Sequence, residues 1–450
     1  MGQNNLENLK VLLAGITPKV RVGRVNKVCD SVIEVTGLEN HAALGSRLQL
    51  ARSGAPPLEG EVIKMNSQSI SMLCEDDIHG VRLGHPVRLL PPLRFCPDDS
   101  WIGRIIDPMG RPLDGKPLLP GPKEFPIDAA PERAIERRAL GKPMSTGLCV
   151  FNTALPLVQG QRIGLFAGSG VGKSRLIAKL VQSLEADLIV LALVGERGRE
   201  LRDFVKTTLG PENMKRCVVI AATSDMAALV RRRSAQSAMS VAEYFRDQGK
   251  NVVYFADSIT RFAEAHREVA LSVGELPTLR GYPASTAHKI MSLCERAGPG
   301  TGQSGDITGI FSVLVAGSDM DEPIADILRG VLDGHVVLDR KIAERGRFPA
   351  IDLLRSVSRS LPEAATESQN QALLILRRLL GAYQNSETMI QAGLYVAGKD
   401  SDLDDAVKIW KDLDHFIGQC EPGTVTDSYH KLFKLLRPTQ LYKSSMSAKA

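Results

Sequence analysis

The sequence predicts an α/β protein with three successive parts: a small N-terminal β-barrel, a central domain built on a parallel sheet, and a C-terminal helical domain. Three observations support this fold class. Short runs of alternating hydrophobic and polar residues fill residues 20–92, as in a small antiparallel barrel. Continuous apolar runs separated by helical stretches fill residues 150–345, which is typical of strands buried on both faces of a parallel sheet. From about residue 361 onward the hydrophobic period is helical.

Composition indicates a soluble globular protein. Its 450 residues include 56 Lys and Arg against 51 Asp and Glu, giving a net charge of +5, and 43% are hydrophobic. These values exclude wholesale disorder, and the small charge surplus gives no reason to expect a nucleic-acid partner. Seven cysteines without a CxxC pair exclude zinc ribbons and favour a reducing compartment. No apolar run reaches the roughly 18–20 residues that span a bilayer, so a cytoplasmic protein is expected.

The first two segments are an N-terminal arm and the barrel. In residues 1–19, Leu6, Leu9 and Ile16 stand at helical spacing and Pro18 ends the pattern. This amphipathic helix is either a docking arm or a helix packed on its own domain. In the barrel, residues 20–92, clusters of Gly, Asn, Asp and Pro separate the strand-like runs at intervals of roughly 8–12 residues.

The central domain is assigned to residues 93–360. Its lead-in is rich in proline, with eight of the 25 prolines between Pro108 and Pro143, so we expect an ordered, extended segment without long helices or strands. Five apolar runs then predict buried strands joined in right-handed βαβ units: QRIGLFAG, DLIVLALVG, CVVIAAT, NVVYFAD and GIFSVLVAG. Residues 361–450 form the helical domain, and their last eight residues, KSSMSAKA, are predicted to be a disordered tail.

The sharpest motif is a glycine-rich loop between a predicted strand and a predicted helix. Glycines are needed there because backbone N–H groups must turn inward around phosphates, next to a helix N-terminus. Lys173 is expected to reach the β- and γ-phosphates, and the Ser174 hydroxyl to bind Mg²⁺. Ala167 replaces the usual first glycine, and Lys173 in place of a third glycine excludes a dinucleotide fingerprint. The predicted phosphate-binding residues are Gly168, Ser169, Gly170, Val171, Gly172, Lys173, Ser174 and Arg175.

Two strand-end carboxylates complete a candidate hydrolytic site. Glu196 ends the run DLIVLALVG, where it is positioned to polarise a water molecule, although charged residues often cap strands. Asp257 ends the run NVVYFA and is the expected second Mg²⁺ anchor, acting through water; the alternative is a cap of the following helix.

Beyond these local signals, the chain resembles the catalytic-subunit family of rotary ATPases, and within it the flagellar and type III protein-export ATPases. The resemblance runs from about residue 20 to residue 440 and is carried by long, ordered motifs. These motifs are DPMGRPLDG, FAGSGVGKS, GERGRE, ADSITRFAEAHREVA, ERAG, LDGHVVLDRKIAERGRFPAID and SVSRS. The resemblance implies that the central domain is of the RecA-like phosphate-loop type.

The resemblance also implies roles for matching residues. Arg359 stands where the family has its arginine finger, which acts on the nucleotide of the neighbouring subunit. Phe348 stands where an aromatic packs on adenine, with an ordinary core residue as the alternative. Arg197 and Arg261 match arginines near the γ-phosphate and the interface, with helix-surface salt bridges as the alternative. The loop 283–289, which faces the central pore in relatives, departs here from the family pattern.

The implied function is ATP hydrolysis by a homohexameric motor that energises flagellar protein export, releasing chaperones and unfolding substrates. ATP and Mg²⁺ are the expected cofactors. The N-terminal arm is expected to bind a peripheral-stalk-like regulator. The pore and C-terminal face are expected to bind a central-stalk-like protein and chaperone–substrate complexes, next to an export gate at the inner membrane.

Three other functions are weighed against export. The first two are a virulence-type injection apparatus and a proton-translocating ATP synthase. Ser174 argues against the synthase, because its catalytic subunits typically have Thr at this position. An RNA-translocating helicase is disfavoured because residues 20–92 contain no Phe, Tyr or Trp for base stacking. The basic run Arg231–Arg233 indicates a solvated helix face more than an acidic or nucleic-acid partner.

Overall fold

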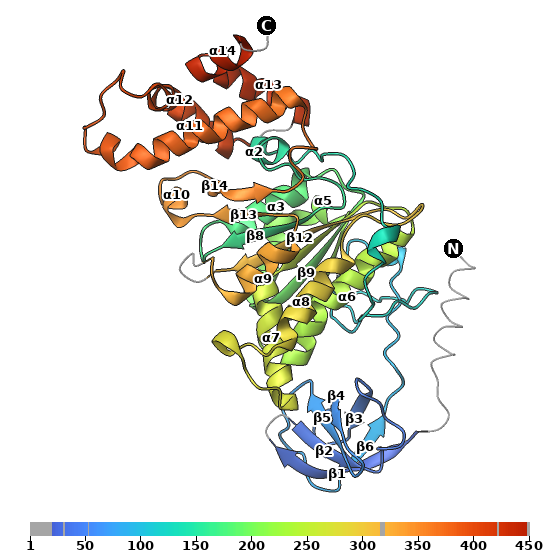
Figure 1. The fold of residues 1–450 in the computed structure, drawn as a ribbon. Helices are drawn as coiled ribbons and strands as arrows, with labels where there is room; N and C mark the ends of the chain where they lie inside the picture. Colours follow the sequence, from blue (N-terminus) through green and yellow to red (C-terminus); the bar gives the residue numbers. More distant parts are fainter. Residues whose placement is uncertain (1–19, 30–31, 53, 316–319, 421–422, 448–450) are drawn as a thin grey trace. The chain divides into compact units, whose positions relative to one another are not determined.

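The computed structural model describes residues 20–29, 32–52, 54–315, 320–420 and 423–447 (Figure 1). The predicted N-terminal arm lies outside these residues. The chain divides into two compact units. Of the described residues, the first unit holds those up to Glu132 with Leu188–Gln248 and Tyr254–Arg296, and the second holds Arg133–Asp187, Gly249–Val253 and those from Ala297 onward. Within the described residues, no helix is both long enough and apolar enough to cross a membrane.

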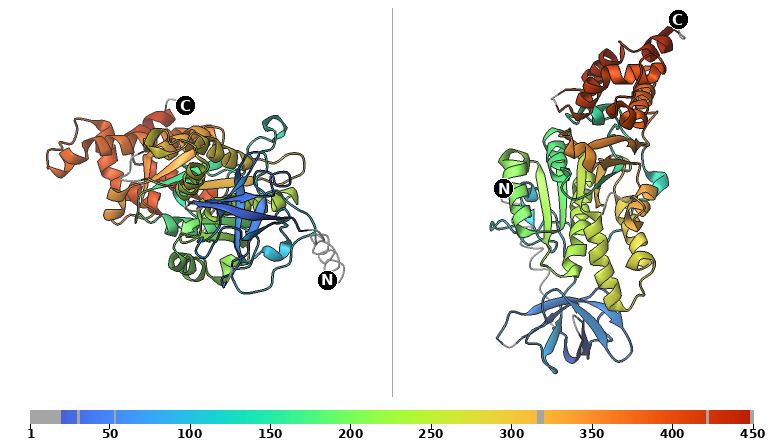
Figure 2. Two further views of the ribbon diagram at one scale, coloured as in Figure 1. Left: turned by 90° about the horizontal axis from the view of Figure 1, so that it is seen from below. Right: turned by 90° about the vertical axis from the view of Figure 1, so that its left-hand side faces the viewer.

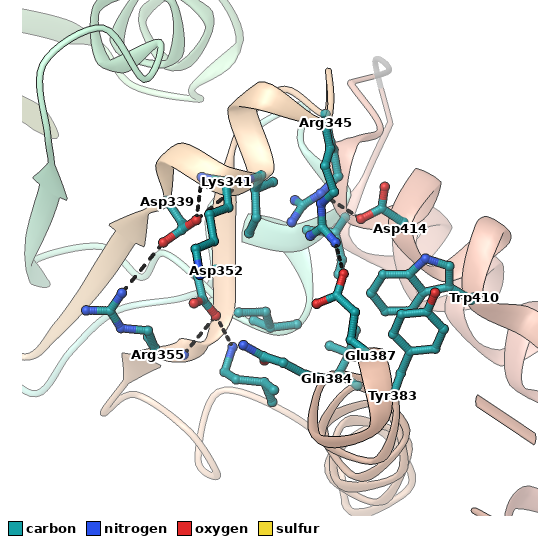
Figure 3. A pocket seen from close by; sticks show the side chains of 16 residues that line it. Asp339, Lys341, Arg345, Asp352, Arg355, Tyr383, Gln384, Glu387, Trp410 and Asp414 are labelled. Atoms are coloured by element: carbon teal, nitrogen blue, oxygen red, sulfur yellow. Dashed lines mark hydrogen bonds and ion pairs between the residues drawn. The ribbon is translucent and has the colours of Figure 1, made fainter. Parts of the chain in front are cut away.

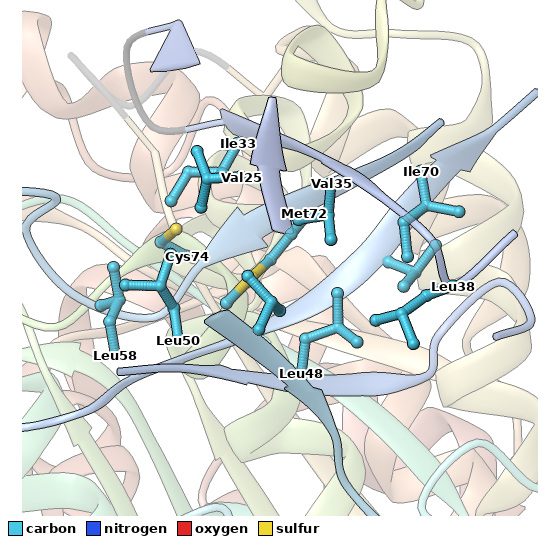
Figure 4. Close-up of a cluster of buried hydrophobic side chains, with 12 residues drawn as sticks. Val25, Ile33, Val35, Leu38, Leu48, Leu50, Leu58, Ile70, Met72 and Cys74 are labelled. Atoms are coloured by element: carbon cyan, nitrogen blue, oxygen red, sulfur yellow. The ribbon is translucent and has the colours of Figure 1, made fainter. Parts of the chain in front are cut away.

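The predicted barrel is confirmed and belongs to the first unit. Six antiparallel strands close in the order β1-β2-β5-β4-β3-β6. Alternate side chains point inward to form an aliphatic core that includes Val25, Ile33, Leu48 and Met72 (Figure 4). The strands are β1 Val22–Cys29, β2 Val32–Thr36, β3 Arg47–Leu50, β4 Leu58–Met65, β5 Ile70–Cys74 and β6 Pro86–Leu89.

The central sheet has eight strands in the order β14-β13-β8-β12-β11-β9-β10-β7. All five predicted strands are present, and the pairs β8–β12 and β9–β10 are parallel as expected. Three further strands were not predicted: β7 has two residues, while β13 and β14 form an antiparallel pair with charged or half-exposed positions. The bounds are β7 Ile105–Ile106, β8 Arg162–Ala167, β9 Leu188–Glu196, β10 Cys217–Thr223, β11 Val252–Asp257, β12 Ile307–Leu314, β13 Gly334–Leu338 and β14 Ile351–Ser358.

Helices accompany the sheet in both units. In the first unit, α6 packs against β9, β10 and α7. Among the residues that the structure describes, the helices of this unit are the short η1 Asp99–Trp101, α4 Gly198–Asp203, the π-helix η3 Phe204–Leu209, α5 Gly210–Met214, α6 Ala228–Asp247, α7 Ile259–Val273, η4 Leu279–Gly281 and α8 Ser285–Arg296. Those of the second unit that precede its last strand are η2 Ala134–Glu136, α2 Cys149–Asn152, α3 Lys173–Ser183, α9 Pro323–Val331 and α10 Arg340–Glu344.

The proline-rich lead-in is ordered, as predicted, because arginines tie it to buried backbone. In the second unit, Arg137 donates to the carbonyl of Ala297 (2.9 Å), and Arg138 donates to the carbonyl of Ser304 (2.6 Å) and pairs with Asp306 (2.7 Å). These contacts replace the hydrogen bonds that a helix or strand would supply.

Four helices form the C-terminal region of the second unit: α11 Glu367–Gln391, α12 Ser401–Gly418, α13 Val425–Leu436 and α14 Gln440–Ser447 (Figures 1 and 2). A capping box of Thr366 and Gln369 begins α11. The prediction of a disordered tail is wrong for residues 443–447, which belong to α14. The buried Asp405 accepts hydrogen bonds from the backbone N–H groups of Gln440 (2.6 Å) and Leu441 (3.1 Å), and this distant cap starts the helix.

The basic run Arg231–Arg233 is not a solvated helix face, so that prediction was wrong. Arg231 pairs with Glu268 (2.7 Å). Arg233 is buried between two barrel carboxylates, Glu61 and Glu75, and so ties α6 to β4 and to the end of β5. Burial lowers the pKa of the Arg233 guanidinium to about 10, which leaves it charged at neutral pH. The sequence did not reveal these pairs because the acidic partners of Arg231 and Arg233 are far away in the chain.

Replacing Arg233 with Met should strongly destabilise the first unit. The change leaves two buried carboxylates without their shared cation, a loss of about 3–5 kcal/mol for buried pairs of this kind. Urea unfolding of the variant should show the loss as a lower midpoint. Arg133→Met is the matched control, because the Arg133–Glu136 pair is largely exposed (82% and 54%) and should change the free energy of unfolding by less than about 1 kcal/mol. Equal midpoints for the two variants would contradict this assignment.

Candidate active site

The glycine-rich loop has the predicted strand–loop–helix structure. It begins where β8 ends at Ala167, and α3 begins at Lys173. Gly170 and Gly172 have φ values of 79° and 91°, a left-handed conformation that favours glycine over residues with a Cβ. Val171 is buried and anchors the loop, while Ser174 is exposed in the first turn of α3. The loop therefore presents backbone N–H groups and a helix N-terminus, which is the arrangement that binds phosphate.

Phe348 lies against this loop and is not a core residue. Its side chain is 47% exposed, and a Cβ placed on Gly172 would lie 3.3 Å from its ring. A flat, accessible aromatic beside a phosphate-binding loop is suited to stacking on a base. The core alternative is thus excluded by exposure, and the predicted contact with adenine stays a prediction.

Arg359 follows β14 and is exposed. Its backbone N–H donates to the carbonyl of Asp333 (2.8 Å), and its guanidinium donates to the carbonyl of Arg329 (3.1 Å). The carbonyl holds the side chain without neutralising its charge. An exposed guanidinium held in this way can reach a neighbouring molecule.

In the first unit, Glu196 and Asp257 end β9 and β11, which are neighbours in the sheet order. Glu196 is half-buried, and its carbonyl accepts a hydrogen bond from the N–H of Ser224 (3.0 Å). Asp257 is 7% exposed. The cap of α7 is Ser258, whose hydroxyl accepts from the N–H of Arg261 (3.3 Å), so the alternative role of Asp257 as the cap is not supported.

The two remaining arginines make the salt bridges that were considered as alternatives. Arg197 pairs with Glu200 (3.3 Å) and its side chain is 80% exposed. Arg261 pairs with Glu264 (3.3 Å), and a Cβ on Gly195 would lie 3.6 Å from the Cβ of Arg261. Both arginines therefore lie at or beside the end of β9, and their roles toward the γ-phosphate and the interface stay predictions.

Each unit carries a different part of the predicted constellation. The first unit carries Glu196 and Asp257 at strand ends, with Arg197 and Arg261 at or beside the end of β9. The second unit carries the glycine-rich loop with Phe348 and Arg359. No group of three or more His, Cys, Asp or Glu side chains in the described part of the chain forms a metal centre. One hydroxyl and one carboxylate nevertheless suit Mg²⁺, which keeps several waters and binds substrate phosphates.

Sequence reasoning missed a chain of polar contacts in the first unit, which runs from the buried His266 to the partly exposed Glu275. The His266 ring lies 2.8 Å from the Ser285 hydroxyl, which donates to Glu275 (2.6 Å). Glu275 also accepts from the backbone N–H of Ser285 (2.9 Å) and so caps α8, which begins inside the segment 283–289 that was expected to be a loop. Burial, together with Arg232, lowers the pKa of His266 to about 4, so the ring is neutral at pH 7. The sequence feature that could have indicated this chain of contacts was Ser285, at the start of a helical hydrophobic pattern.

Comparison with known proteins adds independent findings. Residues 147–358 match the nucleotide-binding domain of the ATP synthase alpha/beta family, and residues 365–433 match the T3SS EscN ATPase C-terminal domain. The flagellum-specific ATP synthase of Caulobacter vibrioides is 39% identical over 96% of this chain and 99% of its own length. The SPI-2 type 3 secretion system ATPase of Salmonella typhimurium is 41% identical over 81% of this chain and 83% of its own. The chain belongs to the type III protein-export ATPase family.

A solved structure supports the same assignment. The assembled ATPase EscN of enteropathogenic E. coli superposes with a TM-score of 0.86 and 35% identity, over 92% of this chain and 100% of that one. The predicted fold class and the predicted ATPase activity are thus confirmed for this export ATPase. The match to the EscN C-terminal domain favours export over proton-translocating synthesis, because it lies outside the nucleotide-binding domain shared with ATP synthases.

Replacing Gly172 with Ala should weaken nucleotide binding by the export ATPase. The left-handed backbone costs an alanine about 1–2 kcal/mol, equivalent to a factor of roughly 5–30, and the new methyl group would press on the Phe348 ring. Calorimetric titration with ADP measures the loss. Gly381→Ala in α11 is the control, because no atom lies within 4 Å of its Cβ position and its φ is not left-handed. Wild-type affinity in Gly172→Ala would refute the role of this loop.

Proposed function

We propose that this chain is the ATPase of a flagellar type III export apparatus, where ATP hydrolysis drives chaperone release and substrate unfolding. The observation that carries the proposal is a phosphate-binding loop joined in one chain to the export-type C-terminal region. The flagellar assignment is supported by relatives named flagellum-specific ATP synthase, which match over 96% of this chain in Caulobacter vibrioides and 92% in Bacillus subtilis. A virulence-type injection apparatus is the second candidate, favoured by the likeness to EscN.

In this proposal, the second unit binds the nucleotide. The loop N–H groups and Lys173 neutralise the phosphate oxygens, and the exposed Phe348 ring stacks on the base. Ser174 and Asp257 would hold Mg²⁺, which supplies positive charge to the β- and γ-phosphate oxygens when it is bound.

Hydrolysis needs a positioned water molecule and compensation of the charge that develops on the γ-phosphate. Glu196 accepts a hydrogen bond from the water and orients it for in-line attack. Arg197 and Arg261 lie at or beside the end of the same strand, where their charges stabilise the phosphoryl oxygens that gain negative charge.

The last positive charge comes from a second copy of the chain. Each chain carries both Glu196 and an exposed Arg359, so identical copies in a ring complete one another's sites. We therefore propose a homohexamer. EscN has been solved as an assembled ATPase and in complex with its central stalk EscO. By analogy, a central-stalk-like protein is proposed for the pore and C-terminal face of this ring.

Further partners follow from the same assignment. Residues 1–19, outside the described residues, are proposed to bind a peripheral-stalk-like regulator. The C-terminal face is proposed to receive chaperone–substrate complexes next to the export gate, with the ring in the cytoplasm against the inner membrane. Deleting the gene distinguishes the two systems: loss of filaments and motility supports flagellar export, whereas normal motility with lost effector secretion supports the injection apparatus.

Replacing Glu196 with Gln should preserve ATP binding and lower kcat by two or more orders of magnitude. The amide keeps the shape of the side chain and removes the negative charge that polarises water. Steady-state phosphate release and ADP titration separate the two effects. Glu212→Gln is the control and should keep wild-type turnover, because Glu212 is an exposed carboxylate on α5 that pairs with Lys215. Near-normal turnover in Glu196→Gln would rule out this residue as the water-positioning group.

Replacing Arg359 with Ala should lower ring-dependent turnover by about 10³-fold or more, the value of arginine fingers in related chemistry. Arg340→Ala, an exposed residue paired with Glu344, is the control. Mixing Arg359→Ala with Glu196→Gln should restore activity, because a site that takes Glu196 from one variant and Arg359 from the other is intact. When the two variants assemble at random in equal amounts, about a quarter of the interfaces contain both an intact Glu196 and an intact Arg359. No recovery on mixing would show that Arg359 does not act across the interface.

A further inference from the structure

One short segment of the second unit connects the phosphate-binding loop with the C-terminal helices. Residues 345–350, between α10 and β14, carry Phe348, whose ring lies against Gly172. On the other side, the end of α12 is tightly packed: a Cβ on Gly418 would lie 3.2 Å from Cγ of Arg347 and 3.4 Å from the carbonyl oxygen of Phe348. The position of Phe348 is therefore defined by contacts with both a nucleotide-binding element and α12.

Arg347 holds this segment in its bent conformation. Its guanidinium donates to the carbonyl of Pro349 (3.2 Å) and to that of Ile351 (2.8 Å), and its Nε lies 2.9 Å from a carboxylate oxygen of Asp414 on α12. The side chain is only 10% exposed, and burial lowers the pKa of Arg347 from its ordinary value. A buried guanidinium of this kind depends on its counter-charge, because an unpaired buried cation is costly.

Helices α11 and α12 each contribute one aromatic and one acidic side chain to the region around Arg345 and Arg347 (Figure 3). On α12, Trp410 precedes Asp414 by one turn, and on α11, Tyr383 precedes Glu387 by one turn. The two rings stack with centroids 3.6 Å apart and planes 4° apart. Glu387 pairs with Arg345 (2.9 Å), so Arg345 and Arg347 reach different helices. These side chains line a cavity of about 360 Å³.

We propose that Arg347 and Asp414 are positioning residues that place Phe348 for base binding and make α12 respond to nucleotide occupancy. Neither touches the phosphates; the pair fixes the backbone on both sides of Phe348. When a base stacks on the Phe348 ring, the displacement of this segment is transmitted through Arg347 and Asp414 to the stacked rings of Trp410 and Tyr383. The inference rests on the proposed function, because it assigns Phe348 to the base of ATP.

The arrangement makes a specific energetic claim. Weakening the Arg347–Asp414 pair frees the segment to sample other conformations, so base stacking loses affinity while the phosphate contacts of the loop remain. Loss of binding that is equal in the ground state and the transition state raises KM and leaves kcat unchanged. A purely structural role would instead lower stability and affect all phosphate ligands together.

The test uses the full chain with Asp414→Asn, which keeps the side-chain size and removes the charge. We expect the KM for ATP and the Ki of ADP to rise about fivefold or more, with kcat within about twofold. The Ki of inorganic tripolyphosphate, which lacks a base, should not change. In a Trp101→Phe background that keeps the Arg347–Asp414 pair, ADP should change the fluorescence of Trp410. In the same background with Asp414→Asn, ADP should no longer change it.

Glu387→Gln is the matched control, since it removes the same charge from the neighbouring pair, which is more exposed and donates to no carbonyl beside Phe348. It should leave the Ki of ADP within about twofold. Asp414→Glu should recover most of the affinity, and Arg347→Lys gives a second variant that keeps the charge and loses the paired carbonyl contacts.

An unchanged Ki of ADP in both Asp414→Asn and Arg347→Lys would overturn the proposal, as would a parallel rise in the Ki of tripolyphosphate. Failure of the wild-type chain to hydrolyse ATP at all would instead overturn the proposed function, so the two failures are distinguishable.

Discussion

The structure depends first on a backbone constraint at the end of β8. Gly170 and Gly172 turn the chain through left-handed conformations before α3 begins. Backbone turns of this kind are what allow successive N–H groups to surround a phosphate. Such a loop keeps its shape when both of its ends are fixed. The buried strand β8 fixes one end and the apolar face of α3 fixes the other, with Val171 buried between them. The hydrophobic core of the second unit thus serves to hold an otherwise unfavourable loop.

The fold could be predicted wherever burial alone determines structure. The runs that became β9 and β10 are apolar on both faces, and the barrel strands alternate, so both patterns are visible in the sequence. The missed elements are those stabilised by distant polar groups. The edge strand β14 carries Asp352 and Arg355, and α14 begins on a cap supplied by Asp405, 35 residues earlier. Sequence windows of a dozen residues contain no trace of such partners.

The candidate site divides in the same way. The positions of Lys173, Glu196 and Asp257 in the fold could be predicted because each ends or follows a recognisable buried strand, while their roles stay predictions. The burial of Arg233 and of Arg347 could not be predicted, because Glu61 lies more than 170 residues from the first and Asp414 lies 67 residues from the second. For both, a positive charge that looks solvated in the sequence is buried against a carboxylate from another element. Charge patterning along the chain is therefore a poor guide to which arginines are exposed.

The way in which strand edges are paired or covered has a consequence for copies of this chain that meet at high concentration. The barrel closes on itself through the pairing of Val22 with Arg88, so it offers no free edge. At one end of the central sheet, Arg377 of α11 donates to the carbonyls of Leu353 and Ser356 on β14 (3.0 and 3.1 Å), and the strand at the other end has two residues. Crowded copies therefore have few unpaired strand groups through which to polymerise, and are left to associate through side chains.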